Sequence, residues 1–209
     1  MNKTFSVLSF LVYAFYLAVA DLDPVLDVSN DKLLTGVDYF IIPILGGSKG
    51  GGITLTSVRN KTCSLDVAQD QSLYEEGLWM TIHPLNIKKG VSGRVIREST
   101  DITIRFSSTK TCAKSTIWKV DKYDKLRKRY FVTIGGVEGD GKSQNGWFRI
   151  QKERLDYKII YCSQEHCISS GPCDVICKNV GAYNEHGRTL VALTDEPFVV
   201  FFEKVIKGK

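Results

Sequence analysis

The segment 148–161 reads FRIQKERLDYKIIY, in which two runs rich in Ile, Phe and Tyr flank a polar break at 152–155. Short runs of β-branched and aromatic residues favour strands, and a brief polar break between two such runs favours a turn that joins them. The same order of run, break and run recurs at 94–106 and at 190–202. Three similar hairpins spaced roughly 40 to 55 residues apart predict a threefold all-β architecture.

The rest of the chain carries the same kind of pattern. After position 20, no window of about 11 residues keeps apolar side chains at helical spacing without interruption by Gly, Pro or β-branched residues. Short β-type runs alternate instead with clusters of Gly, Asn, Asp and Ser, at 39–42, 52–55, 117–120, 130–134 and 147–150. We expect a β-trefoil of twelve short strands with threefold pseudo-symmetry, because an immunoglobulin sandwich or a jelly roll would not predict a triple hairpin.

Composition places the chain among ordinary globular proteins. Its 209 residues are 43% hydrophobic and 24% charged, which excludes a disordered tail, a collagen and a coiled coil. The formal net charge of +5 is weaker than we expect of a protein held to nucleic acid mainly by phosphate contacts. No low-complexity linker divides the chain, so one domain over residues 21–209 is expected.

Residues 1–20 have the features of a secretory signal peptide. Lys3 precedes the uncharged run 5–19, and the small residues Ala18 and Ala20 flank Val19 at the expected cleavage point. A membrane anchor is the alternative, but the apolar run is short and no basic residue follows it directly. We therefore expect a secreted, soluble protein without a membrane partner, and Asn60 in the sequon 60–62 as its N-glycosylation site.

Six cysteines fit this oxidising destination. Cys63 and Cys112 stand apart, whereas Cys162, Cys167, Cys173 and Cys177 form a cluster. Six cysteines allow fifteen pairings, and spacing does not choose among them. Zinc binding is the other interpretation of the cluster, but the cluster contains no C-x-x-C pair and the chain carries a secretion signal. Structural disulfides, and no metal site, are expected.

The order of motifs along the chain resembles the plant Kunitz-type protease inhibitors, the family of soybean trypsin inhibitor and miraculin. The resemblance spans the expected mature chain and includes its aromatic last strand. The stretches that carry it are Val25-Leu26-Asp27, Leu33, Gly36, 39–43 (YFIIP), 50–53 (GGGI), 60–69 (NKTCSLDVAQ), 95–101 (VIRESTD), 145–150 (NGWFRI) and 157–162 (YKIIYC).

The resemblance implies a β-trefoil with three disulfides. Carried onto the matching positions, the family bridges would join Cys63 to Cys112, Cys162 to Cys177 and Cys167 to Cys173, as in the six-cysteine, miraculin-like branch. The soybean-type branch has only four cysteines, so this chain differs from it by an extra pair. A bridge between Cys63 and Cys112 would close the segment between them and stabilise the fold by about 4 kcal/mol in the chain-entropy model.

The resemblance also implies a plant serine protease inhibitor that inserts an exposed, substrate-like loop into a trypsin- or chymotrypsin-like active site. The corresponding segment contains Pro84, Leu85, Asn86, Ile87, Lys88 and Lys89. Asn86 occupies the position of the specificity residue in soybean-type members, but the loop is about five residues longer here, which moves the expected contact to Lys88 or Lys89. Thr35 stands where family members commonly have an Asn that braces the loop, and Thr donates only one hydrogen bond. A solvated loop tip is the alternative for the two lysines.

The run 121–130 is the densest basic segment, with five cations and two tyrosines. Within it, Arg127, Lys128 and Arg129 form a second candidate inhibitory loop. The run could also contact an acidic enzyme surface or an anionic polysaccharide, and a solvated loop is the simplest interpretation.

Nothing in the sequence indicates an enzyme or a cofactor. The histidines His83, His166 and His186 form no metal-binding pair, and no nucleophile-elbow motif is present. We expect a monomer in the apoplast, with the vacuole as the alternative compartment. A non-inhibitory, miraculin-like module that binds a receptor, glycan or cell-wall partner, or a defence or storage protein, is the competing function. Inhibition of other protease classes stays open.

Overall fold

The computed structural model of the chain describes residues 22–45, 48–59, 63, 65–85, 92–107, 111–137, 144–163 and 176–206. These residues form thirteen strands and the single 3-10 turn η1 (Gln144–Gly146). Among them, no helix has the length and apolar character needed to cross a membrane. The expected signal peptide, the sequon at Asn60 and the candidate residues Asn86 to Lys89 lie outside the described residues.

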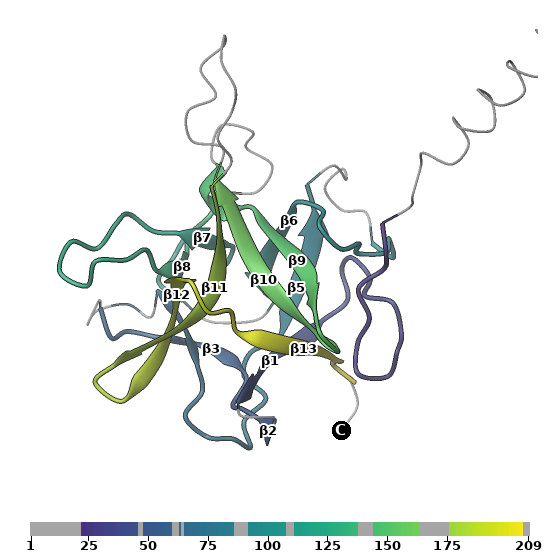
Figure 1. Ribbon diagram of the computed structural model, residues 1–209, viewed down its shortest axis with the longest axis horizontal. Helices are drawn as coiled ribbons and strands as arrows, with labels where there is room; N and C mark the ends of the chain where they lie inside the picture. Colours follow the sequence, from purple (N-terminus) through teal and green to yellow (C-terminus); the bar gives the residue numbers. More distant parts are fainter. Residues whose placement is uncertain are drawn as a thin grey trace, which may run out of the picture.

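Six strands close into a barrel (Figure 1). Their hydrogen-bonded order is β13–β1–β5–β6–β9–β10, and a pairing of β10 with β13, through Tyr157 and Val200, closes the ring. The barrel strands are β1 (Tyr39–Leu45), β5 (Met80–Pro84), β6 (Ile102–Phe106), β9 (Phe148–Glu153), β10 (Asp156–Ser163) and β13 (Val199–Lys204).

Three antiparallel hairpins are joined to this barrel, and their strands pair with one another through β4, which contacts both β8 and β12. The hairpins are β3 (Ile53–Thr56) with β4 (Asp66–Gln69), β7 (Trp118–Val120) with β8 (Val132–Ile134), and β11 (Ile176–Glu185) with β12 (Arg188–Thr194). The two-residue strand β2 (Ser48–Lys49) pairs antiparallel with the end of β1. Without β2, the twelve remaining strands form the expected β-trefoil arrangement of a six-stranded barrel and three hairpins.

Alternation of apolar and polar residues explains how these strands share one core. In β9, Phe148 and Ile150 are buried while Arg149 between them is partly exposed, because successive side chains of a strand point to opposite faces. Trp118 is almost fully buried in the core, with its ring centre about 6 Å from those of Phe106 and Phe148. The apolar runs recognised in the sequence are therefore the barrel and hairpin strands that line the main hydrophobic core. A second, smaller cluster is formed by Ala68, Phe131, Leu190 and Ala192.

Only one of the three expected hairpins is correct. β9 and β10 pair with each other from Asp156 and Glu153 to Tyr161 and Phe148. In the third unit, 190–202, β12 pairs with β11 and β4, whereas β13 pairs with β1 and β10. The reason is the turn before β12: His186 and Gly187 have φ of 48° and 76°, the left-handed pair that closes a two-residue hairpin. This turn folds β12 back along β11.

The first unit, 94–106, is also not a hairpin. Its first run forms isolated bridges with the N-terminal segment, at Val95 with Leu34 and at Arg97 with Pro24. Its second run is β6, which pairs with β5 and β9. The first run pairs with the N-terminal segment because Val25, Leu33 and Ile96 are all fully buried. The N–H of Val25 donates to the carbonyl of Ile96, and the N–H of Ile96 donates to the carbonyl of Leu33.

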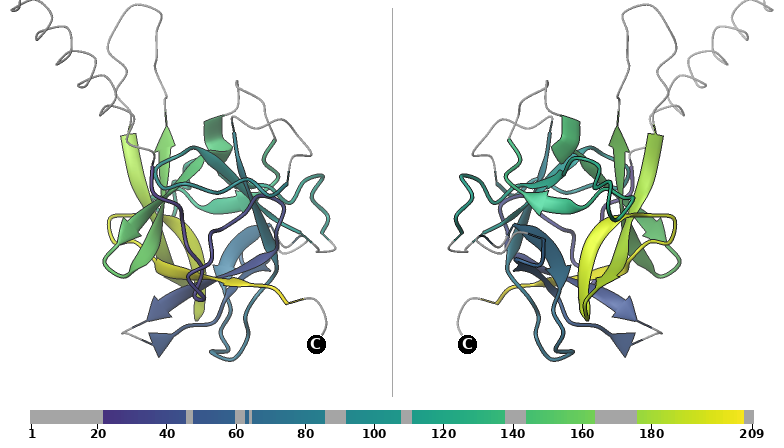
Figure 2. Two further views of the ribbon diagram at one scale, coloured as in Figure 1. Left: turned by 90° about the vertical axis from the view of Figure 1, so that its right-hand side faces the viewer. Right: turned by 90° about the vertical axis from the view of Figure 1, so that its left-hand side faces the viewer.

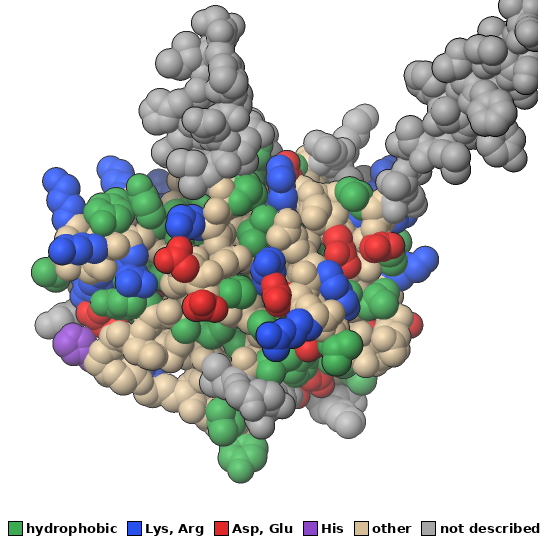
Figure 3. All heavy atoms as spheres, in the orientation of Figure 1, with side chains coloured by type: hydrophobic (Ala, Val, Ile, Leu, Met, Phe, Trp, Pro, Cys, Tyr) green, Lys and Arg blue, Asp and Glu red, His purple; other side chains and the backbone are tan. Residues whose placement is uncertain are grey.

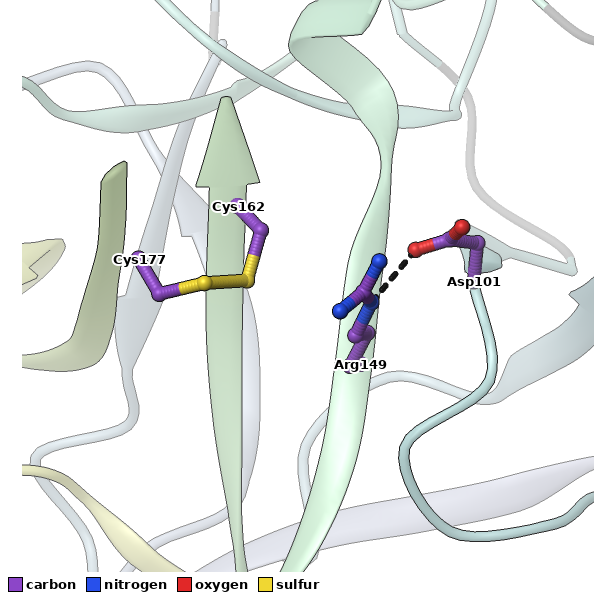
Figure 4. Close-up of a disulfide and its surroundings, with 4 residues drawn as sticks. All are labelled: Asp101, Arg149, Cys162 and Cys177. Carbon is purple, nitrogen blue, oxygen red and sulfur yellow. Dashed lines mark hydrogen bonds and ion pairs between the residues drawn. A yellow bond between two sulfur atoms is a disulfide. The ribbon is translucent and has the colours of Figure 1, made fainter. Parts of the chain in front are cut away.

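Two disulfides lie within the described residues. One joins Cys63 to Cys112, across a sequence separation of 49 residues. The other joins Cys162 of β10 to Cys177 of β11, which are directly opposite each other in the ladder (Figure 4). Both pairings are those implied by the family resemblance. The third expected bridge, Cys167 to Cys173, lies outside the described residues.

Candidate functional site

The first candidate loop leaves the barrel at the end of β5. Pro84 is paired with Ile102 of β6, and Leu85 immediately after it donates its backbone N–H to the carbonyl of Asp101, at 3.0 Å. Ile82 on the same strand is fully buried. The entry to the loop is therefore tied to the core by both side-chain packing and backbone hydrogen bonds.

The chain re-enters the described structure at Ser92, and the N-terminal segment holds this exit. The backbone N–H of Gly93 donates to the carbonyl of Thr35, and the N–H of Thr35 donates to the carbonyl of Arg94, both at 2.8 Å. Gly36 has φ of 78°, and a Cβ there would come within 3.1 Å of the Ser92 side chain. This close approach explains why glycine suits position 36.

Asp101 connects the loop entry to the next barrel strand. Its carbonyl accepts the N–H of Leu85, and its carboxylate accepts a 2.6 Å hydrogen bond from Nε of Arg149 on β9. Figure 4 shows the Asp101 side chain, on the segment just before β6, facing the Arg149 side chain on β9. The sequence carries no local signal for this support, because the two opposite charges lie 48 residues apart in the chain.

Thr35 lies at the base of the loop without a polar partner for its side chain. The residue is 0% exposed, and no described group forms a hydrogen bond with its Oγ1. The backbone of Thr35 thus braces the loop exit, whereas the side chain adds no hydrogen bond there.

The second candidate loop, at 127–129, lies between β7 and β8. Arg127 donates to Asp124 at 3.0 Å and to Glu185 of β11 at 2.6 Å, and its side chain is only 20% exposed. The hydrogen bond to Glu185 raises the pKa of Arg127 above its ordinary value. This guanidinium is already engaged in joining two hairpins.

Its neighbours are similarly constrained. Lys128 has φ of 53°, a left-handed conformation that differs from the extended backbone of a substrate-like loop. The guanidinium of Arg129 lies 4.4 Å from the ring centre of Tyr183. The second candidate loop is therefore attached to the β11–β12 hairpin through the side chains of Arg127 and Arg129.

Comparison with known proteins supports the resemblance noted in the sequence. The family model for Kunitz-type trypsin and protease inhibitors matches residues 25–204. Kunitz trypsin inhibitor 5 of Arabidopsis thaliana is 36% identical over 187 residues, which cover 88% of this chain and 87% of that protein. Miraculin of Synsepalum dulcificum is 37% identical over 88% of this chain and 84% of its own length. The subtilisin inhibitor CLSI-II of Canavalia lineata is 32% identical, over 87% and 92% respectively.

Solved structures show the same fold. Soybean trypsin inhibitor superimposes with a TM-score of 0.68 at 26% identity, covering 88% of this chain and all of that one. The Kunitz-type cysteine protease inhibitor PCPI-3 from potato gives a TM-score of 0.70 at 29% identity, covering 90% of this chain and 100% of its own. These similarities agree with the barrel and hairpins described above.

Proposed function

The chain belongs to the plant Kunitz family of protease inhibitors, and we propose that it inhibits a serine protease by inserting the loop that begins at Pro84 into the active site. The family is one of inhibitors, and the protein is not an enzyme. Relatives named as trypsin, subtilisin and cysteine protease inhibitors define the target classes to be compared.

The observation that carries this proposal is the fixation of both ends of the loop. Leu85 is bonded to Asp101 at the entry, and Gly93 is bonded to Thr35 at the exit. A loop held at both ends loses less conformational entropy when it binds, and this saving appears as affinity. Pro84 adds to the effect because its ring restricts the backbone where the loop starts.

Within the loop, we assign the specificity contact to Lys88 or Lys89. A lysine side chain matches the buried aspartate in the primary pocket of trypsin-like enzymes, which Asn86 does not. In the competing triplet 127–129, Arg127 could enter the protease pocket only if its contact with Glu185 were broken, and Arg129 only if its contact with Tyr183 were broken.

Titration against a panel of proteases tests the function. The panel contains trypsin, chymotrypsin, subtilisin, papain and a cathepsin D-like enzyme. Trypsin should be inhibited, and Lys88→Ala or Lys89→Ala should weaken inhibition by about 100-fold, the loss typical of a central interface residue. Lys125→Ala, an exposed lysine of the β7–β8 loop, is the matched control and should leave inhibition unchanged. Absence of inhibition of every enzyme at micromolar protein would refute the proposal.

Slow cleavage of the bound inhibitor locates the contact directly. Prolonged incubation with trypsin at low pH, followed by mass spectrometry, should reveal a cut after Lys88 or Lys89. A cut after Arg127, Lys128 or Arg129 would move the inhibitory site to the β7–β8 loop.

The proposal includes secretion to the apoplast after cleavage behind Ala20, with a glycan on Asn60. Mass spectrometry of the protein secreted by plant cells should show an N-terminus at Asp21 and a mass that falls after glycosidase treatment. Recovery of full-length, unmodified chain would contradict this part of the proposal.

A further inference from the structure

A cavity of about 690 Å³ lies beside the β7–β8 loop, and none of its lining residues belongs to the loop that begins at Pro84. Its walls come from β7 and the loop that follows it, from η1, from β10 and from the two strands β11 and β12, which are distant from one another in the sequence. Figure 2, right, turns this side of the molecule toward the viewer. The volume falls within the range of small-ligand sites.

The cavity is strongly cationic. Two carboxylates, Asp121 and Asp195, face five cations in its lining, which are Lys119, Lys122, Lys128, Arg129 and Lys178. Figure 3 shows basic side chains gathered over the β7–β8 loop, on the left of the view.

Both carboxylates of the lining already have cation partners, whereas three of its lysines have no acidic partner among the described residues. Asp121 accepts a hydrogen bond from Arg59 at 3.3 Å, and Asp195 is paired with Lys178 at 3.0 Å. Within the described part of the chain, no carboxylate forms an ion pair with Lys119, Lys122 or Lys128. Asp195 thus has a cation partner in the lining and Asp121 shares Arg59 with Asp66, whereas these three lysines can direct their charge toward a ligand.

Tyrosines give the same cavity broad apolar faces. Tyr123 and Tyr130 are 47% and 42% exposed, and their ring centres lie 5.0 Å apart. Tyr161 of β10, almost fully buried, contributes to the inner wall. Exposed rings beside unpaired lysines suit a ligand that has both anionic groups and flat C–H surfaces, as the pyranose rings of an acidic sugar chain do.

The walls are preformed. The carboxylate of Asp124 accepts the backbone N–H groups of Leu126 and Arg127, each at 3.0 Å, and so fixes the turn of the β7–β8 loop. The Arg127–Glu185 pair and the stacking of Arg129 on Tyr183 attach this loop to the β11–β12 hairpin. A ligand would therefore meet a cavity that needs little reorganisation, which favours binding.

We propose that this cavity binds a short anionic oligosaccharide, with its carboxylates or sulfates on Lys119, Lys122 and Lys128 and a sugar ring on the Tyr123–Tyr130 pair. The site does not depend on the loop at Pro84. An acidic peptide would use the lysines but not the tyrosine faces, so the aromatic pair favours the sugar.

Calorimetric titration of the secreted, full-length mature protein tests the site. The probes are a galacturonate hexamer, a heparin-derived sulfated hexasaccharide, neutral cellohexaose and a hexaglutamate peptide. We expect one or both acidic sugars to bind, and which of them binds distinguishes carboxylate from sulfate recognition. Cellohexaose should not bind, and raising the salt from about 50 to about 200 mM should weaken binding of the acidic sugar.

Three variants assign the binding to the cavity. The double variant Lys119→Gln with Lys122→Gln should weaken binding at least tenfold, about 1.4 kcal/mol. Tyr130→Leu, which keeps an apolar side chain but removes the ring, should also weaken it. Lys125→Gln, in the same loop but outside the cavity lining, is the matched control and should bind like the unaltered protein.

Three results would overturn the inference. The first is no binding of either acidic sugar at millimolar concentration. The second is hexaglutamate binding as tightly as the sugars with Tyr130→Leu unchanged, which would indicate a site for acidic peptides. The third is an equal loss in Lys125→Gln, which would indicate diffuse attraction to a basic surface.

Discussion

At the residue scale, Thr35 shows how a backbone role and a side-chain role separate at one position. Its N–H and carbonyl both bond to the exit of the candidate loop, while its hydroxyl is buried without a described partner. A buried hydroxyl that makes no hydrogen bond loses its hydration without compensation. The position was recognised in the sequence as a departure from the family pattern, but only the structure shows that the backbone retains the bracing contact.

Removal of this hydroxyl should therefore stabilise the protein. Thr35→Val keeps the shape of the side chain and should raise the free energy of unfolding by about 1 kcal/mol in urea titrations. The matched control is Thr116→Val, because the hydroxyl of Thr116 donates to the carbonyl of Phe106 at 2.8 Å, and its loss should lower stability by about 1 kcal/mol. Equal destabilisation by both changes would show that the Thr35 hydroxyl has a partner.

At the scale of elements, the β7–β8 loop and the β11–β12 hairpin are held together by charge. Arg127 donates to Glu185, whose side chain is 9% exposed, and this hydrogen bond lowers the pKa of Glu185 below its ordinary value of 4.5. The folded state therefore favours the ionised carboxyl. Its contribution to stability is complete above about pH 4.5 and is lost as the pH falls through the lowered pKa.

Glu185→Gln should remove this contribution. At neutral pH, the variant should lose about 2 kcal/mol of unfolding free energy, because a hydrogen bond between two charged groups is replaced by a weaker one. The difference from the unaltered protein should shrink on acidification below about pH 4.5. Urea titrations of both proteins, from neutral pH to below about pH 4.5, measure this difference in unfolding free energy. A difference independent of pH would contradict the assignment. Glu153→Gln, in the more exposed pair with Lys158, is the control and should have a smaller effect.

Strand pairing at this scale shows the limit of local patterns. The runs at 148–153 and 156–161 form the expected hairpin because only two residues, Arg154 and Leu155, separate β9 from β10. The run 190–193 has an equally clear pattern, but the left-handed turn at His186 and Gly187 pairs it with the strand before it. The local pattern indicates that a segment is a strand. Its partner strand depends on which of the neighbouring turns joins two strands into a hairpin and on which apolar strand faces have to be buried.

At the scale of the whole molecule, the two described disulfides should differ in what they contribute. Cys63–Cys112 spans 49 residues and links the segment before β4 to the one after β6. Cys162–Cys177 spans 15 residues and joins positions already opposite each other in the ladder. A bridge across the longer loop restricts the unfolded chain more.

Cys63→Ser with Cys112→Ser should therefore lower the free energy of unfolding by about 4 kcal/mol. The matched pair Cys162→Ser with Cys177→Ser should cost about 3 kcal/mol or less. Thermal and urea unfolding of both double variants measure the difference. A larger loss from the second pair would show that β10 and β11 depend on their bridge more than on their ladder and core contacts.

Local sequence patterns were sufficient for the all-β class and the positions of most strands, and the order of motifs was sufficient for the family, whose known bridges imply the two described disulfide pairings. Those features depend on residue type and short-range order, which the chain carries directly. Tertiary structure alone decided which strands pair beyond the β9–β10 hairpin, how Thr35 and Asp101 fix the ends of the candidate loop, and that Lys119, Tyr130 and Lys178 share one cavity. These arrangements depend on contacts between residues far apart in the chain, and competition among turns and buried faces selects them only when the whole barrel closes.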